Sequence, residues 1–260
     1  MRIAIFQVDA FTNELFKGNP AAVCPLDEWL TDGMLQNIAA ENNLPETAFF
    51  VKEKEGFHIR WFTPSTEVSL CGHATLAAAA VIFRKLGYKQ NQIKFNSRSG
   101  ELNVKRDMDS FVLDFPSDKP TAIDKDEELL NAIGMEPVEW FKCTEDYLLV
   151  YQNEGEISSI KPNFSELAGI TQRGVIVTAP GTQTDFVSRF FAPAIGINED
   201  PVTGSAHTAL TPYWAERLNK EKLNALQLSP RGGRLSCTNK GERIEIGGRV
   251  AFYLQGLIEV

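Results

Sequence analysis

The most constraining feature of the chain is a set of matching segments separated by about 130 residues. Residues 60–64 read Arg-Trp-Phe-Thr-Pro, and residues 189–193 read Arg-Phe-Phe-Ala-Pro. Further along, Arg-Ser-Gly-Glu-Leu at 98–102 is echoed by Arg-Gly-Gly-Arg-Leu at 231–235. The matches keep their order, which indicates duplication. A period of this length is that of a domain and exceeds any solenoid repeat, so the pattern predicts two domains of one fold.

The boundary between the two halves is expected in residues 114–120, where aspartate and proline are frequent. We therefore predict an N-terminal domain over 1–118 and a C-terminal domain over 119–248. The last strand, 249–260, follows the second repeat and is expected to return to pair with the first domain.

Both halves contain short runs of β-branched and aromatic residues between turn signals, which predict strands. The ranges are 3–11, 46–51, 57–62, 92–95 and 111–115, then 147–152, 174–178, 186–191 and 243–246. A helix is predicted over 31–42, with Thr31 as its N-cap and Leu44-Pro45 closing it.

One further helix is apolar around its whole circumference, over about 73–86, and ends before Gly87. Such a helix must be enclosed on all sides. Its counterpart over 204–220 is more amphipathic and contains Pro212, which should kink it or shift its start. The expected fold class is α+β, with two pseudo-symmetric domains, each a barrel-like, mostly antiparallel sheet around a central helix.

The composition is that of an ordinary globular protein, with 43% apolar and 23% charged residues and a net charge of −8. The acidic balance argues against nucleic acid as a partner. The longest apolar run, 76–83, is too short to span a membrane, and residues 1–9 lack the features of a signal peptide. We expect a cytoplasmic protein with no membrane partner.

The four cysteines and three histidines are scattered, without C-x-x-C or H-E-x-x-H spacing. The cysteines are expected to be reduced thiols. A metal site would have to be assembled from distant segments, so no metal is predicted.

Three polar segments are candidates for chemistry. Glu46 is a carboxylate that enters an otherwise apolar strand, and it is either a rim residue facing water or a proton shuttle in apolar surroundings. Residues 71–73, Cys-Gly-His, stand at the start of the buried helix, where free N–H groups favour a carboxylate or a developing oxyanion. His73 could instead merely cap the helix, with Cys71 packing as a small hydrophobic residue.

Residues 199–207, Glu-Asp-Pro-Val-Thr-Gly-Ser-Ala-His, again precede a helix. A capping turn explains Asp200 and Ser205 well. It does not explain why each half places an acid five residues before a glycine at its central helix, Gly72 and Gly204. Two such helix starts facing each other would suit a small carboxylate undergoing proton transfer.

Taken together, six segments closely resemble the phenazine-biosynthesis isomerase (PhzF-like) family over nearly the whole chain. They are 9–12, 16–23, 45–49, 60–64, 70–75 and 199–207. The resemblance implies the diaminopimelate epimerase-like fold, with the active site between two pseudo-symmetric domains. It also implies a homodimer.

The resemblance further implies that Glu46 is an acid/base that moves a proton between carbons without a cofactor. His73 and Asp200 match residues that orient the substrate or relay protons. Gly72, Gly204 and Ser205 match groups that bind its carboxylate or enolate. Asn19, in the Gly-Asn-Pro turn, is a further candidate for substrate binding, although such turns are more often scaffolding.

Two other functions remain open at this point. The related epimerases use two cysteines, but the second half has no thiol opposite Cys71, which disfavours a two-base racemase. A protein that binds a metabolite without converting it is the non-enzymatic alternative. The substrate is expected to be a small carboxylic acid of undefined identity.

Overall fold

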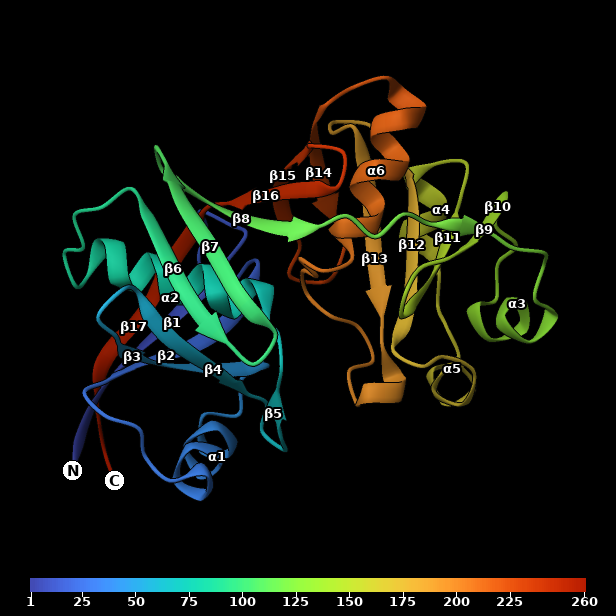
Figure 1. Cartoon of the computed structure of the whole chain (residues 1–260). Helices are drawn as coiled ribbons and strands as arrows, with labels where there is room; N and C mark the ends of the chain where they lie inside the picture. The colour runs from blue at the N-terminus through green and yellow to red at the C-terminus, as the bar shows by residue number, and fades with distance from the viewer. The chain divides into compact units, whose positions relative to one another are not determined.

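The computed structural model describes residues 1–260 and divides into two compact units (Figure 1). The first comprises Met1–Asp114 with Gly247–Val260, and the second comprises Phe115–Ile246. The chain passes between the units within β8 (Ser110–Pro116) and again within β16 (Arg243–Gly248). These crossings lie a few residues from the boundaries at 118 and 248 expected from the sequence.

In the first unit, β2 runs parallel to β3 and β4 runs parallel to β6, while the other paired neighbours are antiparallel. In order of pairing, the strands are β17 (Val250–Glu259), β1 (Arg2–Ala10), β2 (Asn19–Leu26), β3 (Glu46–Lys52), β4 (Phe57–Phe62), β6 (Gln92–Ser97), β7 (Gly100–Asp107) and β8, with the short β5 (Glu67–Val68) also on β4.

The second unit repeats this pattern of pairing. In order, its strands are β9 (Thr121–Ala122), β10 (Glu139–Lys142), β11 (Asp146–Val150), β12 (Gly174–Pro180), β13 (Phe186–Phe191), β14 (Lys222–Gln227) and β15 (Gly233–Asn239). β11 is parallel to β12 and β13 is parallel to β14, and the remaining pairs are antiparallel. The correspondence of the two sheets confirms the predicted fold class.

The duplication also extends to individual side chains. On β4, the Arg60 guanidinium donates two hydrogen bonds to the Glu67 carboxylate, at 2.8 and 2.9 Å. On β13, Arg189 makes the same paired contact with Glu199, at 2.7 and 3.0 Å. Two parallel N–H···O bonds fix both the distance and the orientation of a pair. In each unit, this pair therefore anchors the loop that leads to the central helix.

The central helix of the first unit is α2 (Gly72–Arg84), and every residue from His73 to Phe83 is buried. It packs against β1, β2 and β3, and in Figure 1 it lies between these strands and β6 and β7. The helix ends at Arg84, two residues before the predicted end, and the expected stop at Gly87 is present. Gly87 has a positive φ of 70°, and the Tyr88 N–H donates to the Ile82 carbonyl at 3.2 Å, which closes the last turn.

The helix α1 (Asp32–Asn42) leads directly to the first candidate residue. The Thr31 hydroxyl accepts a hydrogen bond from the Met34 N–H at 3.3 Å, which confirms the predicted N-cap. Asn43 ends the helix in the left-handed region at φ 47°. Because α1 also packs against β3 and β4, the turn that follows Asn43 places Glu46 at the start of β3.

The central helix of the second unit is α6 (His207–Leu218), which begins three residues later than predicted. Pro212 lies inside it and cannot donate to the Thr208 carbonyl one turn earlier. The Asp118 N–H donates to this carbonyl instead, at 3.2 Å, so the lost bond is replaced. The unit also contains three short helices, α3 (Glu127–Ile133), α4 (Glu154–Ser159) and α5 (Phe164–Ile170). Their buried apolar side chains form one cluster with side chains of β11, β12 and β13.

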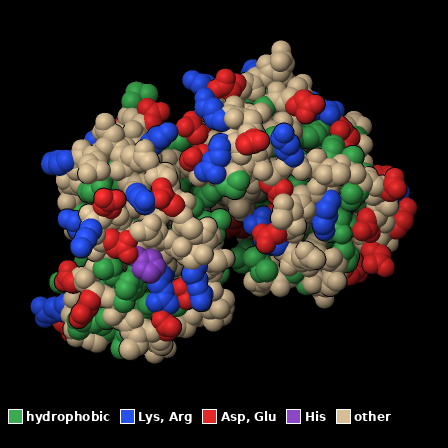
Figure 2. Space-filling view, in the orientation of Figure 1, with side chains coloured by type: hydrophobic (Ala, Val, Ile, Leu, Met, Phe, Trp, Pro, Cys, Tyr) green, Lys and Arg blue, Asp and Glu red, His purple; other side chains and the backbone are tan.

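The surface carries charges of both signs. Figure 2 shows acidic and basic side chains intermingled over most of the visible face, with acidic side chains gathered along its right-hand edge. No helix combines the length and the apolar content needed to cross a bilayer.

Candidate functional site

The first candidate site joins the start of β3 to the start of α2. The Glu46 Oε2 and the His73 Nε2 lie 3.1 Å apart, and the side chains are 12% and 7% exposed. The separation is that of an ion pair, although the angles are not those of a hydrogen bond. Neither atom has a hydrogen-bond partner. Buried polar atoms are normally partnered, so this pair is poised to interact with another group.

Cys71 lies on the other side of the same imidazole. Its Sγ is 3.5 Å from the His73 Nδ1, and its carbonyl accepts from the Thr75 hydroxyl at 2.5 Å. Cys71 is the N-cap of α2 but supplies no side-chain cap. The positive end of the α2 dipole is therefore not neutralised by a capping side chain.

The protonation states of this cluster follow from burial and from the neighbouring charge. Burial, with a smaller contribution from Glu46, raises the pKa of the Cys71 thiol. Burial opposes protonation of His73, but the facing Glu46 carboxylate favours the imidazolium, and the pKa of His73 lies well above its ordinary value. At neutral pH the cluster thus presents a thiol and an imidazolium beside Glu46.

The ligand atoms of Glu46, Cys71 and His73 lie within 4.8 Å of one another, a spacing that a metal ion could bridge. Sequence spacing gave no signal for this grouping, because β3 and α2 are brought together only by the fold. Metal ligation requires a thiolate and a neutral imidazole. Without a metal ion, the raised pKa values of Cys71 and His73 favour their protonated forms, so a metal ion would have to displace both protons.

Two further predicted residues lie in the same unit. Gly72 is the first residue of α2, between Cys71 and His73. Asn19 is the first residue of β2, fully buried, and its Cα is paired with that of Ala10 on β1. α2 packs against both of these strands.

In the second unit, the predicted residues form a hydrogen-bonded turn before α6. The Asp200 Oδ2 accepts a hydrogen bond from the Thr203 hydroxyl at 2.5 Å. The buried Gln227 side chain donates to the Asp200 carbonyl at 2.8 Å and accepts from the Thr203 N–H at 2.9 Å. Gly204 and Ser205 follow, and the Gly204 carbonyl accepts from the N–H of His207 at 3.0 Å.

Ser205 has a partner that the sequence did not suggest. Its hydroxyl oxygen accepts a hydrogen bond from Arg173 Nη1 at 3.0 Å, and Arg173 is held in turn by the buried Asp146. Asp146 and Arg173 each lie directly before a predicted strand, where charged residues are common, so no sequence signal distinguished them.

His207 lies inside the second unit, and its Nε2 is buried without a hydrogen-bond partner. It is fully buried, its Nδ1 lies 2.8 Å from the Thr203 carbonyl, and its ring lies 5.8 Å from the Phe186 ring. A protonated Nδ1 satisfies this geometry with a neutral ring. Burial lowers the pKa of His207 to about 4.

This burial makes His207 a source of acid instability. In the unfolded chain the imidazole takes up a proton below its ordinary pKa of 6.5, whereas the folded protein resists protonation until about 4. Stability is therefore unaffected above the unfolded pKa and falls as the pH drops between the two values, by about 3 kcal/mol in total. Urea unfolding of the wild type and of His207→Gln, at about pH 7.5 and about pH 4.5, should show most of this loss in the wild type alone.

The partly buried His58, changed to Gln, provides the control for this comparison. If the free energy of unfolding fell equally at low pH in the wild type and in His207→Gln, groups other than His207 would be responsible for the acid instability.

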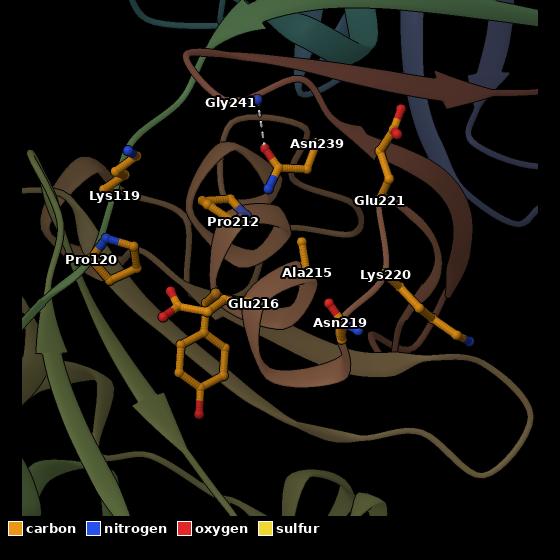
Figure 3. Close-up of a pocket in the computed structure, with 11 residues that line it drawn as sticks. Lys119, Pro120, Pro212, Ala215, Glu216, Asn219, Lys220, Glu221, Asn239 and Gly241 are labelled. Carbon is orange, nitrogen blue, oxygen red and sulfur yellow. Dashed lines mark hydrogen bonds between the residues drawn. The ribbon is translucent and has the colours of Figure 1, made fainter.

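A separate hollow of about 460 Å³ opens on the second unit near the end of α6 (Figure 3). Lys119, Glu216 and Asn219 are among its lining residues. None of the predicted site residues lines it. We do not assign the chemistry to this hollow.

The fold defines a class of protein. Two repeated units, each with a central helix at whose start polar groups gather, are the features of the epimerase-like fold expected from the sequence.

Comparison with known proteins identifies the family. Residues 8–256 match the family model described as "Phenazine biosynthesis-like protein". A protein of Pseudomonas aeruginosa named an uncharacterized isomerase is 52% identical over 260 residues, which cover all of both chains. The chain therefore belongs to the phenazine biosynthesis-like protein family, an isomerase family. This confirms the family resemblance and the enzyme class expected from the sequence.

Solved structures agree with this assignment. A phenazine biosynthesis protein of the PhzF family from Enterococcus faecalis has a TM-score of 0.98 at 46% identity, with full coverage of both chains. A predicted epimerase from Pseudomonas aeruginosa, at 18% identity over 99% of both chains, has a TM-score of 0.76 and shows the shared fold alone.

Proposed function

We propose that the protein is a cofactor-independent isomerase that moves a proton between two carbons of a small carboxylic acid, with Glu46 as the proton shuttle. The observation that carries this proposal is the Glu46–His73 pair. Both facing atoms are buried and without hydrogen-bond partners, and they lie 3.1 Å apart at the start of a helix.

The proposed steps balance without an added reagent. The Glu46 carboxylate takes a proton from one carbon and becomes a carboxylic acid, while the electron pair of the broken C–H bond delocalises into the substrate. The same proton then passes to the second carbon, and the carboxylate is restored. His73 orients this carboxylate and relays protons. The uncapped N–H groups that begin at Gly72 stabilise the negative charge that develops on the substrate.

Roles for Asp200, Gly204, Ser205 and Asn19 toward the same substrate remain predictions from the sequence. The tight hydrogen-bonding of Asp200 to Thr203 supports a fixed orientation for its carboxylate. Preorganised polar groups of this kind need no rearrangement when charge develops.

The experiment that tests the function is proton NMR in D₂O with pools of small carboxylic acids, including a dihydro-hydroxyanthranilate. Disappearance of a substrate C–H signal in the presence of protein, with a new signal at a second carbon or with uptake of deuterium, identifies a substrate and supports proton transfer. An acid that binds tightly but keeps all its C–H signals after long incubation would contradict the proposal and indicate a metabolite-binding protein.

Cys71 provides a test against a thiol mechanism. Because burial and Glu46 raise the pKa of this thiol, we expect it to act as a neighbour of His73 and not as a base. Cys71→Ser should therefore lower turnover by much less than the factor of about 10² that removal of an acid/base group costs. A loss as large as that of Glu46→Gln would restore a two-base, epimerase-like mechanism.

A further inference from the structure

Arg173 links a buried carboxylate to the hydroxyl of Ser205. Its Nε donates to the Asp146 Oδ1 at 2.8 Å, its Nη2 contacts the other oxygen of the same carboxylate, and its Nη1 donates to the Ser205 Oγ at 3.0 Å. Asp146 begins β11, Arg173 immediately precedes β12, and Ser205 lies two residues before α6. β11 and β12 are neighbouring parallel strands (Figure 1).

The guanidinium of Arg173 is held in place from several sides. The Asp146 side chain is only 2% exposed, and the two N–H···O contacts fix the plane of the guanidinium against it. The Phe190 ring lies 5.4 Å from the guanidinium carbon, and the exposed Glu145 carboxylate is 3.5 Å from Nε. With a side chain 25% exposed, Arg173 is a rigid link and not a mobile surface cation.

This contact determines what the Ser205 hydroxyl can do. A guanidinium has only donors, so the serine oxygen must act as the acceptor and its own proton must point elsewhere. No other hydrogen bond of the Ser205 side chain is found in the structure. A hydroxyl that accepts from a cation is polarised and becomes a stronger donor. The free O–H is therefore prepared for an anionic acceptor.

We propose that Arg173 is a positioning residue that orients and polarises the Ser205 hydroxyl for donation to the carboxylate of the substrate. This inference rests on the proposed function, because it takes a small carboxylic acid as the ligand. It adds Arg173, and the Asp146 carboxylate that holds it, to the residues of the site. Neither side chain touches the reacting atoms.

The chain contains a matched control. Arg189 makes the same paired contact with a carboxylate, that of Glu199, and its guanidinium carbon also lies near an aromatic ring, 4.7 Å from the centre of Phe191. Its remaining donor group bonds the carbonyls of Ile157 and Ile160 and no predicted site residue. Arg189→Lys therefore measures how much anthranilate affinity is lost when an arginine–carboxylate pair is broken while the Arg173–Ser205 hydrogen bond is kept.

The test measures the dissociation constant of anthranilate, a small amino-bearing carboxylate, by calorimetric titration of the full chain. Ser205→Ala and Arg173→Lys should each weaken binding about tenfold. The first removes the hydroxyl, and the second leaves a lysine that cannot donate to Asp146 and to Ser205 at the same time. The double variant should bind no more weakly than either single variant, since both changes remove one donor. Arg189→Lys loosens the anchor of the 199–207 loop but keeps the Arg173 donor to Ser205, so it should weaken binding less than Arg173→Lys.

Three results would overturn the proposal: no binding of anthranilate to the wild type, wild-type affinity in Arg173→Lys, or a double variant with additive losses. Thermal unfolding of each variant separates loss of binding from loss of folding. The binding readout is independent of catalysis. Full turnover in Glu46→Gln with weakened binding in Arg173→Lys would overturn the proposed function and leave this inference standing.

Discussion

Glu46→Gln is expected to lower turnover by about 10²- to 10⁴-fold while the protein stays folded, because an amide keeps the shape of the side chain but cannot carry a proton. The effect should fall on kcat, since the amide still occupies the same place beside His73. The measurement is the steady-state rate on the acid identified by NMR.

Glu53→Gln is the matched control for this variant. Glu53 directly follows the other end of β3, is exposed, and accepts a hydrogen bond from the Asn96 amide at 2.5 Å. It is expected to retain wild-type turnover. If Glu46→Gln retained comparable turnover, the assignment of the proton shuttle would be wrong.

His73→Gln is expected to reduce turnover by about 10²-fold, because it removes the group that orients the Glu46 carboxylate and relays protons. The pH profile provides a sharper readout. The neighbours of His73 raise its pKa, so the imidazolium form is present at neutral pH and is lost only as the pH rises through this raised value. The wild type should thus lose activity on the alkaline side, and this limb should be absent in His73→Gln.

His58→Gln provides the control for the pH profile. His58 lies on β4, where its ring contacts the Trp29 ring edge to face at 4.9 Å between centres. Its substitution should leave the alkaline limb in place. An unchanged limb in His73→Gln would assign it to another group.

The sequence predicted the elements whose local chemistry is unambiguous. The circumferential apolar run of α2, the Thr31 cap and the stop at Gly87 depend on neighbouring residues only. Each expected strand is present, with ends that differ by one or two residues.

Several strands were not predicted, because their sequences lack the usual strand pattern of β-branched and aromatic residues. β2 has the sequence Asn-Pro-Ala-Ala-Val-Cys-Pro-Leu, whose prolines and alanines indicate a turn, yet its first six residues are buried. β7 is mostly exposed and polar, with only Leu102 and Val104 buried. β10, β14 and β15 were not predicted either. These strands are determined by pairing with their neighbours more than by their own composition.

The site was predictable only in part. Residue types and a family resemblance identified Glu46 and His73, but their facing atoms are brought together by the packing of α2 on β3. Arg173 had no local signal, because its importance depends on a contact with Ser205 across the fold. Long-range contacts between single charged residues leave no periodic trace in a sequence.

The central claim, that one carboxylate carries the proton between two carbons, is tested most directly with a substrate deuterated at the carbon that loses its proton. In a single turnover in H₂O, the account predicts deuterium at the receiving carbon of the product, because the largely buried Glu46 side chain returns the same hydrogen that it removed. Product with no deuterium above the solvent background would contradict direct transfer of the same hydrogen by one shuttle.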